Sequence, residues 1–259
     1  MTGRVHHISS RDNAFLKDLR RLAQQTNAYR KQGPFWVEGD PLCRAALARG
    51  VQPVVGVLSE SFWQSAKAKE AWATSASKTV IIADALFDDI STLESPAPMG
   101  FVFNLPTASA LLPDAPSVVL DRVQDAGNVG SILRSAAAFG FKQVIALQGT
   151  AALWSPKVLR AGMGAHWGLH LLEGAALADL AALQVPLVVT SSHAGAYLHA
   201  QTLPHPCAWV LGHEGQGVCP ELEALAQVKV RIAQPGGEES LNVAAAAAIC
   251  LHASVAGSI

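Results

Sequence analysis

The stretch VKVRIAQPGGEESLNVAAAAAICLH, residues 228–252, decides the fold of this chain because it changes from a strand pattern to a helix pattern around two glycines. Its β-branched run at 228–232 predicts a buried strand, which the following Pro-Gly-Gly ends. The alanines at 244–248 then predict a helix. Ser240 and Asn242 therefore stand at a helix start, where they either cap unpaired backbone N–H groups or belong to a functional site.

Two earlier passages have the same form. Residues 120–140, LDRVQDAGNVGSILRSAAAFG, leave a predicted strand at 117–120 through a Gly-Asn loop and enter a helix that ends at Gly140. Residues 208–218, AWVLGHEGQGV, predict a strand followed by a glycine-dense loop. Further predicted strands at 143–147, 169–172 and 187–190 alternate with predicted helices at 155–162 and 177–183. Continuous apolar strands of this kind are typical of a parallel sheet covered by helices on both faces.

The glycines of GHEGQG, residues 212–217, bear on the kind of ligand. Their spacing is not G-x-G-x-x-G and they lie late in the chain, so an α/β oxidoreductase that binds a dinucleotide is not favoured. Glycines at the end of a strand let the backbone approach a ligand closely. The loop therefore predicts a ligand recognised mainly through backbone N–H and C=O groups.

Positive charge is concentrated at the N-terminus, where residues 1–50 hold nine Lys or Arg and four Asp or Glu, against ten and sixteen in the remainder. A helix is predicted from Ser10 or Asp12 to about Lys31, before Gly33. Phe15, Leu19, Leu22 and Ala23 form its apolar stripe, and Lys17, Arg20 and Arg21 lie on the opposite side. That side is either an ordinary solvated face or a surface that contacts RNA, because Lys and Arg neutralise phosphates.

The rest of the first hundred residues predicts a small α/β unit. Residues 35–40, FWVEGD, read as a strand and turn, with Asp40 as the N-cap of a helix that starts at Pro41. Strands are also predicted at 54–58, 79–82 and 101–105. The Pro- and Ala-rich segment 106–116 is the predicted linker, which divides the chain into domains at 1–105 and 117–259.

Composition excludes several classes of protein. Half of the 259 residues are apolar, yet the longest uninterrupted apolar run is the nine residues 243–251. With a polar N-terminus as well, we expect neither a membrane span nor a secretory signal, and hence a cytoplasmic protein. Cys43, Cys207, Cys219 and Cys250 form no C-x-x-C pair, so we expect reduced core cysteines and no metal site.

Together the three passages resemble the three motifs of the SpoU (TrmH) family of ribose 2′-O-methyltransferases, which belong to the knotted SPOUT class. The resemblance rests on Asn128 followed six residues later by Arg134, on the 212–217 glycine loop and on Glu239-Ser240-Leu241-Asn242-Val243. It implies a mostly parallel α/β sheet with a C-terminal trefoil knot. Phe35-x-Val37-Glu38-Gly39 and Pro98-Met99-Gly100 are also similar to the family pattern, which implies that 1–105 is an RNA substrate-binding domain like ribosomal protein L30e.

The resemblance also implies a chemistry, namely methylation of a ribose 2′-hydroxyl by S-adenosylmethionine, without metal, in a homodimer. Ribosomal RNA is expected ahead of transfer RNA, because an additional N-terminal domain is present. The implied catalytic residues are Asn128, Arg134, Glu214, Ser240 and Asn242. The implied cofactor-binding residues are Thr190, Leu211, Gly212, Gly217, Ile232, Gln234 and Leu241.

Arg134 acts in the family as a proposed base, although anchoring a phosphate and stabilising charge is physically easier for a side chain that is almost never neutral. The sequence departs from the family at Ala233 and Gln234, where Pro and Met are usual, and at Gly162, where Ser is commoner. The first departure predicts weaker or altered cofactor binding. It also keeps open the alternative of a non-catalytic RNA-binding protein that retains the fold.

Overall fold

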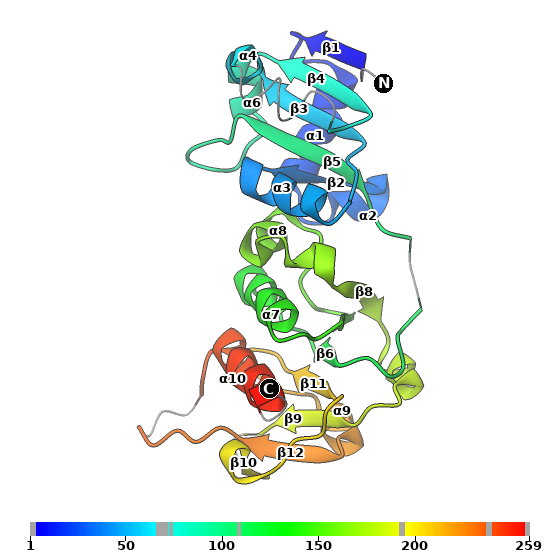
Figure 1. Ribbon diagram of the computed structural model, residues 1–259, viewed down its shortest axis with the longest axis vertical. Helices are drawn as coiled ribbons and strands as arrows, with labels where there is room; N and C mark the ends of the chain where they lie inside the picture. The colour runs from blue at the N-terminus through cyan, green and yellow to red at the C-terminus, as the bar shows by residue number, and fades with distance from the viewer. Residues whose placement is uncertain are drawn as a thin grey trace. The chain divides into compact units, whose positions relative to one another are not determined.

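The computed structural model describes residues 4–65, 72, 75–107, 110–191, 195–236 and 240–256 (Figure 1). The chain forms two compact units. The first contains Met1–Thr107 and Trp154–Trp167, and the second contains Ala108–Leu153 and Gly168–Ile259. The change of unit after Thr107 lies inside the predicted linker. The predicted domain limits missed that Trp154–Trp167 packs with the first unit.

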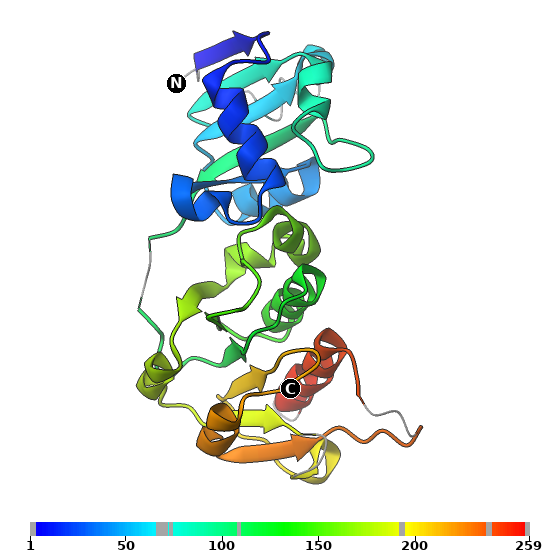
Figure 2. The ribbon, with the colours of Figure 1, turned by 180° about the vertical axis from the view of Figure 1, so that it is seen from behind.

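The first unit is built on a five-stranded mixed sheet of order β1-β4-β3-β5-β2. β1 pairs with β4 and β4 with β3 in parallel, whereas β5 is antiparallel to both β3 and β2. Seen from behind, α1 lies across one face of this sheet (Figure 2). The strands are β1 (Arg4–Ile8), β2 (Pro34–Glu38), β3 (Val55–Ser59), β4 (Lys78–Ile82) and β5 (Met99–Asn104); the helices are α1 (Ala14–Gln24), α2 (Ala28–Gln32), α3 (Asp40–Ala48), α4 (Glu60–Gln64), α6 (Asp84–Asp88) and α8 (Pro156–Gly162).

The single long helix predicted before Gly33 is wrong, because the structure has two helices there. Asn13, not Ser10 or Asp12, is the N-cap of α1, and its side chain accepts a hydrogen bond from the N–H of Phe15. The backbone turns extended at Gln25 and ends α1 (φ −104°, ψ 127°). Leu16 is buried in place of Phe15, which is only half-buried.

The N-cap predicted for α3 is also wrong. Gly39 occupies the N-cap position, with a φ of 98°, and Asp40 is the first helical residue. Asp40 instead accepts a hydrogen bond from Arg44 Nε, at 2.7 Å, one turn further along the helix. An acidic group in the first turn still favours the helix, through its dipole.

Two family-pattern residues of the first unit have packing roles. Glu38 is 7% exposed, and its carboxylate accepts hydrogen bonds from Ser91 Oγ and from the N–H of Ala97, which fixes the loop before β5. Gly100 faces the indole of Trp36. A Cβ at Gly100 would lie 2.3 Å from Trp36 Cη2 and 2.6 Å from the carbonyl oxygen of Val37.

The segment Trp154–Trp167 contributes aromatic rings to the core of the first unit. Phe35 packs against Trp154 and Trp167, with ring centroids 4.7 Å and 5.8 Å away, and Phe103 packs against Trp167. Gly162 approaches the imidazole of His166 so closely that a Cβ would lie 2.6 Å from its Cε1. This contact accounts for glycine at a position where the family more often has serine.

The second unit is a seven-stranded sheet of order β10-β12-β9-β11-β6-β7-β8, parallel throughout. The predictions for β6, β7 and β9 are confirmed to the residue, whereas β10 and α9 were not predicted and the predicted helix at 177–183 is a 3₁₀ helix. The strands are β6 (Ser117–Leu120), β7 (Gln143–Leu147), β8 (His170–Ala175), β9 (Leu187–Thr190), β10 (Ala196–Tyr197), β11 (Ala208–Leu211) and β12 (Val228–Arg231); the helices are α7 (Ala126–Ala138), α9 (Pro220–Leu225) and α10 (Val243–Ala256), with 3₁₀ turns η2 (Leu177–Ala182) and η3 (Leu198–Ala200). A further 3₁₀ turn, η1 (Ala165–Gly168), begins in the Trp154–Trp167 segment of the first unit.

The core of this unit lies between the sheet and its helices. Val119, Ile145 and Val210 on adjacent strands are fully buried, and α7 packs against α10 (Figure 1). Trp209 Nε1 donates a hydrogen bond to Ser254 Oγ at 2.7 Å, which ties the last turn of α10 to β11. Within the described part of the chain, no helix combines the length and apolar character of a membrane span.

The close approach at Gly100 generates a prediction. We expect Gly100→Ala to lower the free energy of unfolding by about 1–3 kcal/mol, because the added methyl displaces Trp36 or the β2 backbone. Gly236→Ala is the matched control, since a Cβ there meets nothing within 4 Å. Urea unfolding followed by tryptophan fluorescence measures both. Equal stability of the two variants would contradict this account of Gly100.

Candidate functional site

The candidate site lies in loops at the carboxyl edge of the parallel sheet. The loops follow β6, β11, β9 and β12, and neighbouring parallel strands place their carboxyl ends at the same edge. Thr190 pairs with Val230, and Leu211 pairs with Leu120, at the ends of these strands. The strand order thus brings together segments that lie far apart in the sequence.

Glu214 joins two of these loops through its carboxylate. Oε2 accepts the N–H of Gln124 at 3.2 Å, and Oε1 accepts the N–H of Asp125 and the side-chain amide of Asn128, each at 3.1 Å. Burial acts to raise the pKa of Glu214, but the hydrogen bonds from Asp125, Asn128 and Gln124 oppose it and hold the pKa below its ordinary value. The group is therefore ionised near neutral pH.

Asn242 adds the third motif to this network. Its Nδ2 donates to Asn128 Oδ1 at 2.9 Å, and its own Oδ1 accepts the N–H groups of Ala244 and Ala245. Asn242 thus caps α10 and also belongs to the site. The two interpretations of its position, as a helix cap and as a functional residue, are therefore compatible. Ser240 is exposed next to it. Glu239 of the predicted third motif lies outside the described residues.

Arg134 is exposed on α7. It stands six residues after Asn128, roughly 9 Å further along the helix axis. No hydrogen bond or ion pair joins Arg134 to another of the described residues. The structure therefore links Asn128, Glu214 and Asn242 directly and leaves the guanidinium of Arg134 available for a ligand.

Asp121 and Arg122 form a second connection that the sequence interpretation missed. Asp121, 2% exposed, accepts the N–H of Cys219 at 2.8 Å and two hydrogen bonds from the guanidinium of Arg122. Arg122 NH1 also donates to Gln216 Oε1 at 3.0 Å. Burial acts to raise the pKa of Asp121, but Arg122 and the Cys219 N–H outweigh it and lower the pKa. The sequence feature that could have indicated this connection is the adjacent Asp-Arg pair at the end of a predicted strand.

The glycine loop after β11 closes on itself. His213 and Gly217 exchange backbone hydrogen bonds of 3.0 Å and 2.8 Å, and His213 Nδ1 accepts the N–H groups of Gly215 and Gln216. A Cβ on Gly212 would lie 2.2 Å from the carbonyl carbon of Gly217, whose φ is 69°. Gly212 and Gly217 are thus required by the loop itself, before any ligand is considered.

The predicted cofactor-binding residues differ in exposure. Leu211 is buried, Thr190, Ile232 and Gln234 are half-buried, and Leu241 is 40% exposed. The side-chain oxygen of Gln234 is enclosed and has no hydrogen-bond partner among the described residues. A buried acceptor without a partner is costly, so this atom fits a ligand that brings a donor.

No metal site is found in the part of the chain that the structure describes, where no group of three His, Cys, Asp or Glu side chains gathers. The four cysteines are free. Burial raises the pKa of the Cys207 and Cys250 thiols to about 11 and about 12.

The basic residues predicted to contact RNA are each paired with a carboxylate of the first unit. The pairs are Lys17 with Asp12 at 3.1 Å, Arg20 with Asp89 at 3.8 Å, and Arg21 with Asp18 at 3.2 Å. Each of these cations therefore has an acidic neighbour, and only Asp89 comes from outside the first 50 residues. Their role toward RNA stays a prediction.

Fold and site together define an α/β protein whose ligand loops lie at the carboxyl edge of a parallel sheet. The sequence matches the model of the SpoU rRNA Methylase family over residues 115–252. The chain belongs to this family, which confirms the resemblance seen in its three motifs.

Full-length relatives support this assignment. The chain is 31% identical to an uncharacterised tRNA/rRNA methyltransferase of Synechocystis sp., over 97% of this chain and 94% of that one. It is 27% identical to the 23S rRNA (guanosine(2553)-2′-O)-methyltransferase RlmP of Bacillus subtilis, over 96% and 98%. The structure of an AdoMet-bound rRNA methyltransferase from Sinorhizobium meliloti superposes with a TM-score of 0.83, at 26% identity, covering 99% of this chain and all of that one.

The Glu214 network generates a prediction with a pH dependence. In Glu214→Gln an NH₂ group that faces N–H donors replaces one acceptor oxygen. The free energy of unfolding at pH 7 should therefore fall by about 0.5–1 kcal/mol. The expected value is small because the site is exposed. Because the folded-state pKa of Glu214 is lowered, its contribution is present above the ordinary value of 4.5 and is lost as the pH falls through the folded-state pKa.

Urea unfolding of the wild type and Glu214→Gln at pH 7 and in mild acid measures this dependence. The difference between the two proteins should shrink in acid. Glu223→Gln on α9 is the matched control, and we expect it to change little at either pH. A difference for Glu214→Gln that is equal at both pH values would contradict the assigned role of the carboxylate.

Proposed function

We propose that this protein transfers a methyl group from S-adenosylmethionine to a ribose 2′-hydroxyl of structured RNA. The observation that carries the proposal is the direct hydrogen bonding of Asn128, Glu214 and Asn242, one from each family motif, at the carboxyl edge of the sheet. Ribosomal RNA is the first candidate substrate and transfer RNA the second, because the Bacillus subtilis relative is named for a 23S rRNA guanosine. We expect an enzyme that acts on such a substrate to be located in the cytoplasm.

The residues present fit the cofactor. Thr190, Leu211 and Ile232 stand at the ends of neighbouring strands, and the unpartnered Gln234 oxygen is an acceptor of the kind that the exocyclic amino group of adenine requires. Gln234 therefore replaces the usual methionine with a polar wall. Gly212, Gly217 and Leu241 complete the set that would hold S-adenosylmethionine, which supplies a methyl carbon activated by the sulfonium.

The residues of this chain must align the 2′-hydroxyl with that carbon and stabilise the oxygen as its proton leaves. Arg134, charged and free of protein partners in the described part of the chain, anchors a phosphate next to the target ribose and stabilises the developing negative charge. Asn128 is held by Glu214 and Asn242, so its amide is preorganised to orient the ribose. Ser240, exposed beside Asn242, is the candidate to take a hydrogen bond from the hydroxyl.

The finer features of the fold belong to the same proposal. The trefoil knot and the L30e-like character of the N-terminal domain stay predictions, as does RNA contact through Lys17, Arg20 and Arg21. The homodimer stays a prediction as well, because Ile249, 42% exposed on α10, is a single exposed apolar side chain and not a contiguous apolar patch.

A non-catalytic RNA-binding protein of the same fold is the second candidate, and Ala233 and Gln234 are the observation that favours it. Cofactor binding distinguishes the two candidates, because only the enzyme requires S-adenosylmethionine.

Calorimetry with S-adenosylmethionine in EDTA should show binding by the wild type. We expect Gln234→Met, which keeps the length of the side chain, to weaken binding roughly 2- to 10-fold through loss of one hydrogen bond. The corresponding cofactor with an unsubstituted purine base, which lacks the amino group and has no oxygen in its place, is the control and should bind both proteins alike. Absence of heat for the wild type at millimolar cofactor would favour the non-catalytic candidate.

Single-turnover methylation of RNA across pH tests Arg134. If it anchors phosphate and charge, Arg134→Lys keeps a small residual rate, and Arg134→Ala loses roughly 10²- to 10⁴-fold, with cofactor binding unchanged in both. If it acts as a base, the Lys variant should instead gain rate at high pH. Lys142→Ala, another exposed cation of the second unit, is the control. Wild-type rates for Arg134→Ala would exclude both roles.

A further inference from the structure

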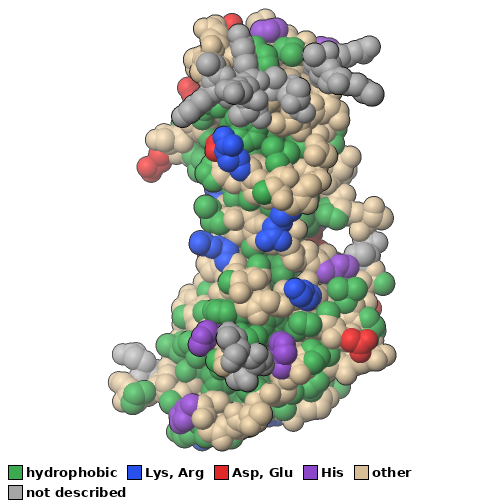
Figure 3. Space-filling model, viewed as in Figure 1, with side chains coloured by type: hydrophobic (Ala, Val, Ile, Leu, Met, Phe, Trp, Pro, Cys, Tyr) green, Lys and Arg blue, Asp and Glu red, His purple; other side chains and the backbone are tan. Residues whose placement is uncertain are grey.

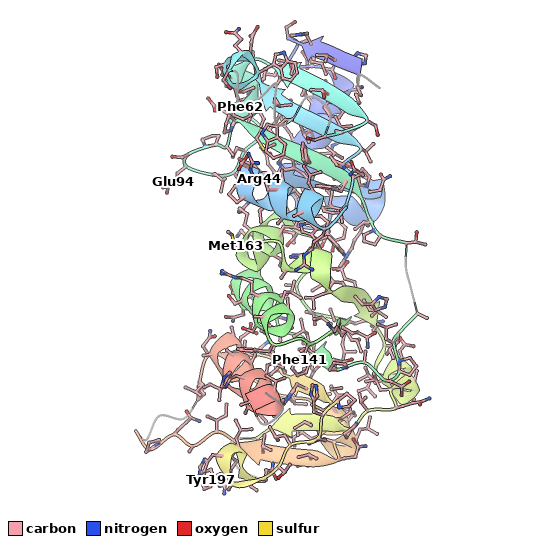
Figure 4. All side chains as sticks on the ribbon, viewed as in Figure 1. Arg44, Phe62, Glu94, Phe141, Met163 and Tyr197 are labelled. Atoms are coloured by element: carbon pink, nitrogen blue, oxygen red, sulfur yellow. The ribbon has the colours of Figure 1, made fainter. Side chains whose placement is uncertain are left out.

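The exposed side chains of Tyr197 and His199 and the half-buried side chain of Arg231 form a stack at the β10 edge of the seven-stranded sheet. Tyr197, 44% exposed, lies on β10 (Figure 4). The guanidinium carbon of Arg231, the last residue of β12, is 4.6 Å from the centroid of its ring. The exposed imidazole of His199 is nearly parallel to the same ring, at an interplanar angle of 16° and a centroid distance of 5.6 Å.

The backbone holds this stack in place. Tyr197 is the partner of Arg231 in the pairing of β10 with β12. Arg231 Nε donates to the carbonyl oxygen of Gly195 at 3.0 Å. Gly195 has a φ of 96°, and a Cβ there would lie 2.3 Å from the carbonyl oxygen of Lys229. The surface is therefore preorganised, which reduces the entropy lost when a ligand binds.

The charge around the stack favours an anionic partner. The sequence contains no Asp or Glu from residue 180 to 213, nor from 224 to 237, and the second stretch includes Lys229 and Arg231. Among the described residues Arg231 has no carboxylate partner, in contrast to the cations of α1. On the face shown in Figure 3, histidine and apolar side chains gather at the β10 end of the second unit, and acidic side chains are not seen there.

The stack lies at the same edge of the sheet as the candidate site. Tyr197 and Arg231 are the last residues of the parallel strands β10 and β12, and Ile232 directly follows Arg231. A protein partner is less suited to this surface, because Leu198, which stands between Tyr197 and His199 in the sequence, is buried and offers no apolar contact. Open rings beside uncompensated cations instead match the way single-stranded nucleic acid is bound, by base stacking and phosphate contact.

We propose that Tyr197, His199 and Arg231 bind an unpaired stretch of the RNA substrate, with a base stacked on the outer face of the Tyr-His pair and a phosphate beside Arg231. The proposal rests on the proposed function and names a contact outside the methyl-transfer site.

Fluorescence anisotropy with two labelled RNAs tests the stack. One is a hairpin with a single-stranded adenosine tail, and the other is the same hairpin with an abasic tail of equal charge. Tyr197→Leu, which keeps apolar bulk, should weaken binding of the adenosine tail roughly 10-fold and leave the abasic RNA nearly unaffected. Tyr197→Phe keeps the ring and should bind both RNAs like the wild type. His199→Ala should reproduce the loss without altering β10 itself.

Wild-type binding that does not distinguish the two tails, or that is absent for both, overturns the stack. Equal affinity of the wild type, Tyr197→Leu and His199→Ala for the adenosine tail overturns it as well. Sedimentation measures the oligomeric state of each variant, and a changed state would assign these residues to a contact between protein chains and so overturn the stack too. Calorimetry with S-adenosylmethionine on the same samples keeps the two proposals distinct. Retained cofactor binding with unchanged RNA affinity rejects the stack alone, whereas lost cofactor binding in the wild type rejects the proposed function.

Discussion

The carboxylate of Glu214 is the group on which the geometry of the site depends. It is a charged acceptor for two backbone N–H groups and for Asn128, and hydrogen bonds to an ionised acceptor are roughly twice as strong as neutral ones. Asn128 then orients Asn242, which caps α10. One charge therefore fixes the exit of β6 and the entry of α10, although about 120 residues of sequence separate these elements.

The parts of the fold that could be predicted are those that local sequence determines. Strands β6, β7 and β9 are buried on both faces, so their residues form continuous apolar runs with clear ends. Strand β1 carries His6 and His7 at a sheet edge, and β10 has only two residues, so neither produces such a run. The break between α1 and α2 depends on the backbone at Gln25, where no glycine or proline marks it.

The candidate site was predictable as a set of residues but not as a network. Motif spacing indicated Asn128, Glu214 and Asn242. Their hydrogen bonds depend on the order of the strands in the sheet, which the periodicity of the sequence does not predict. Asp121 and Arg122 were missed for the same reason, since their partners lie in the loop after β11. Conversely, the partners of the basic residues on α1 were not predicted. Charge counting along a helix does not include the acidic side chain that Asp89 brings from a distant loop.

The aromatic packing of Trp154 and Trp167 has a consequence for how this chain can be divided. Their partners Phe35 and Phe103 come from β2 and β5, so the N-terminal unit is completed by residues inserted between β7 and β8. Cleavage of the chain at the linker and separation of the pieces would leave two indoles of the C-terminal piece in water and an unfilled core in the N-terminal piece. Recombination that exchanges the N-terminal unit must therefore also exchange, or repack, this inserted segment.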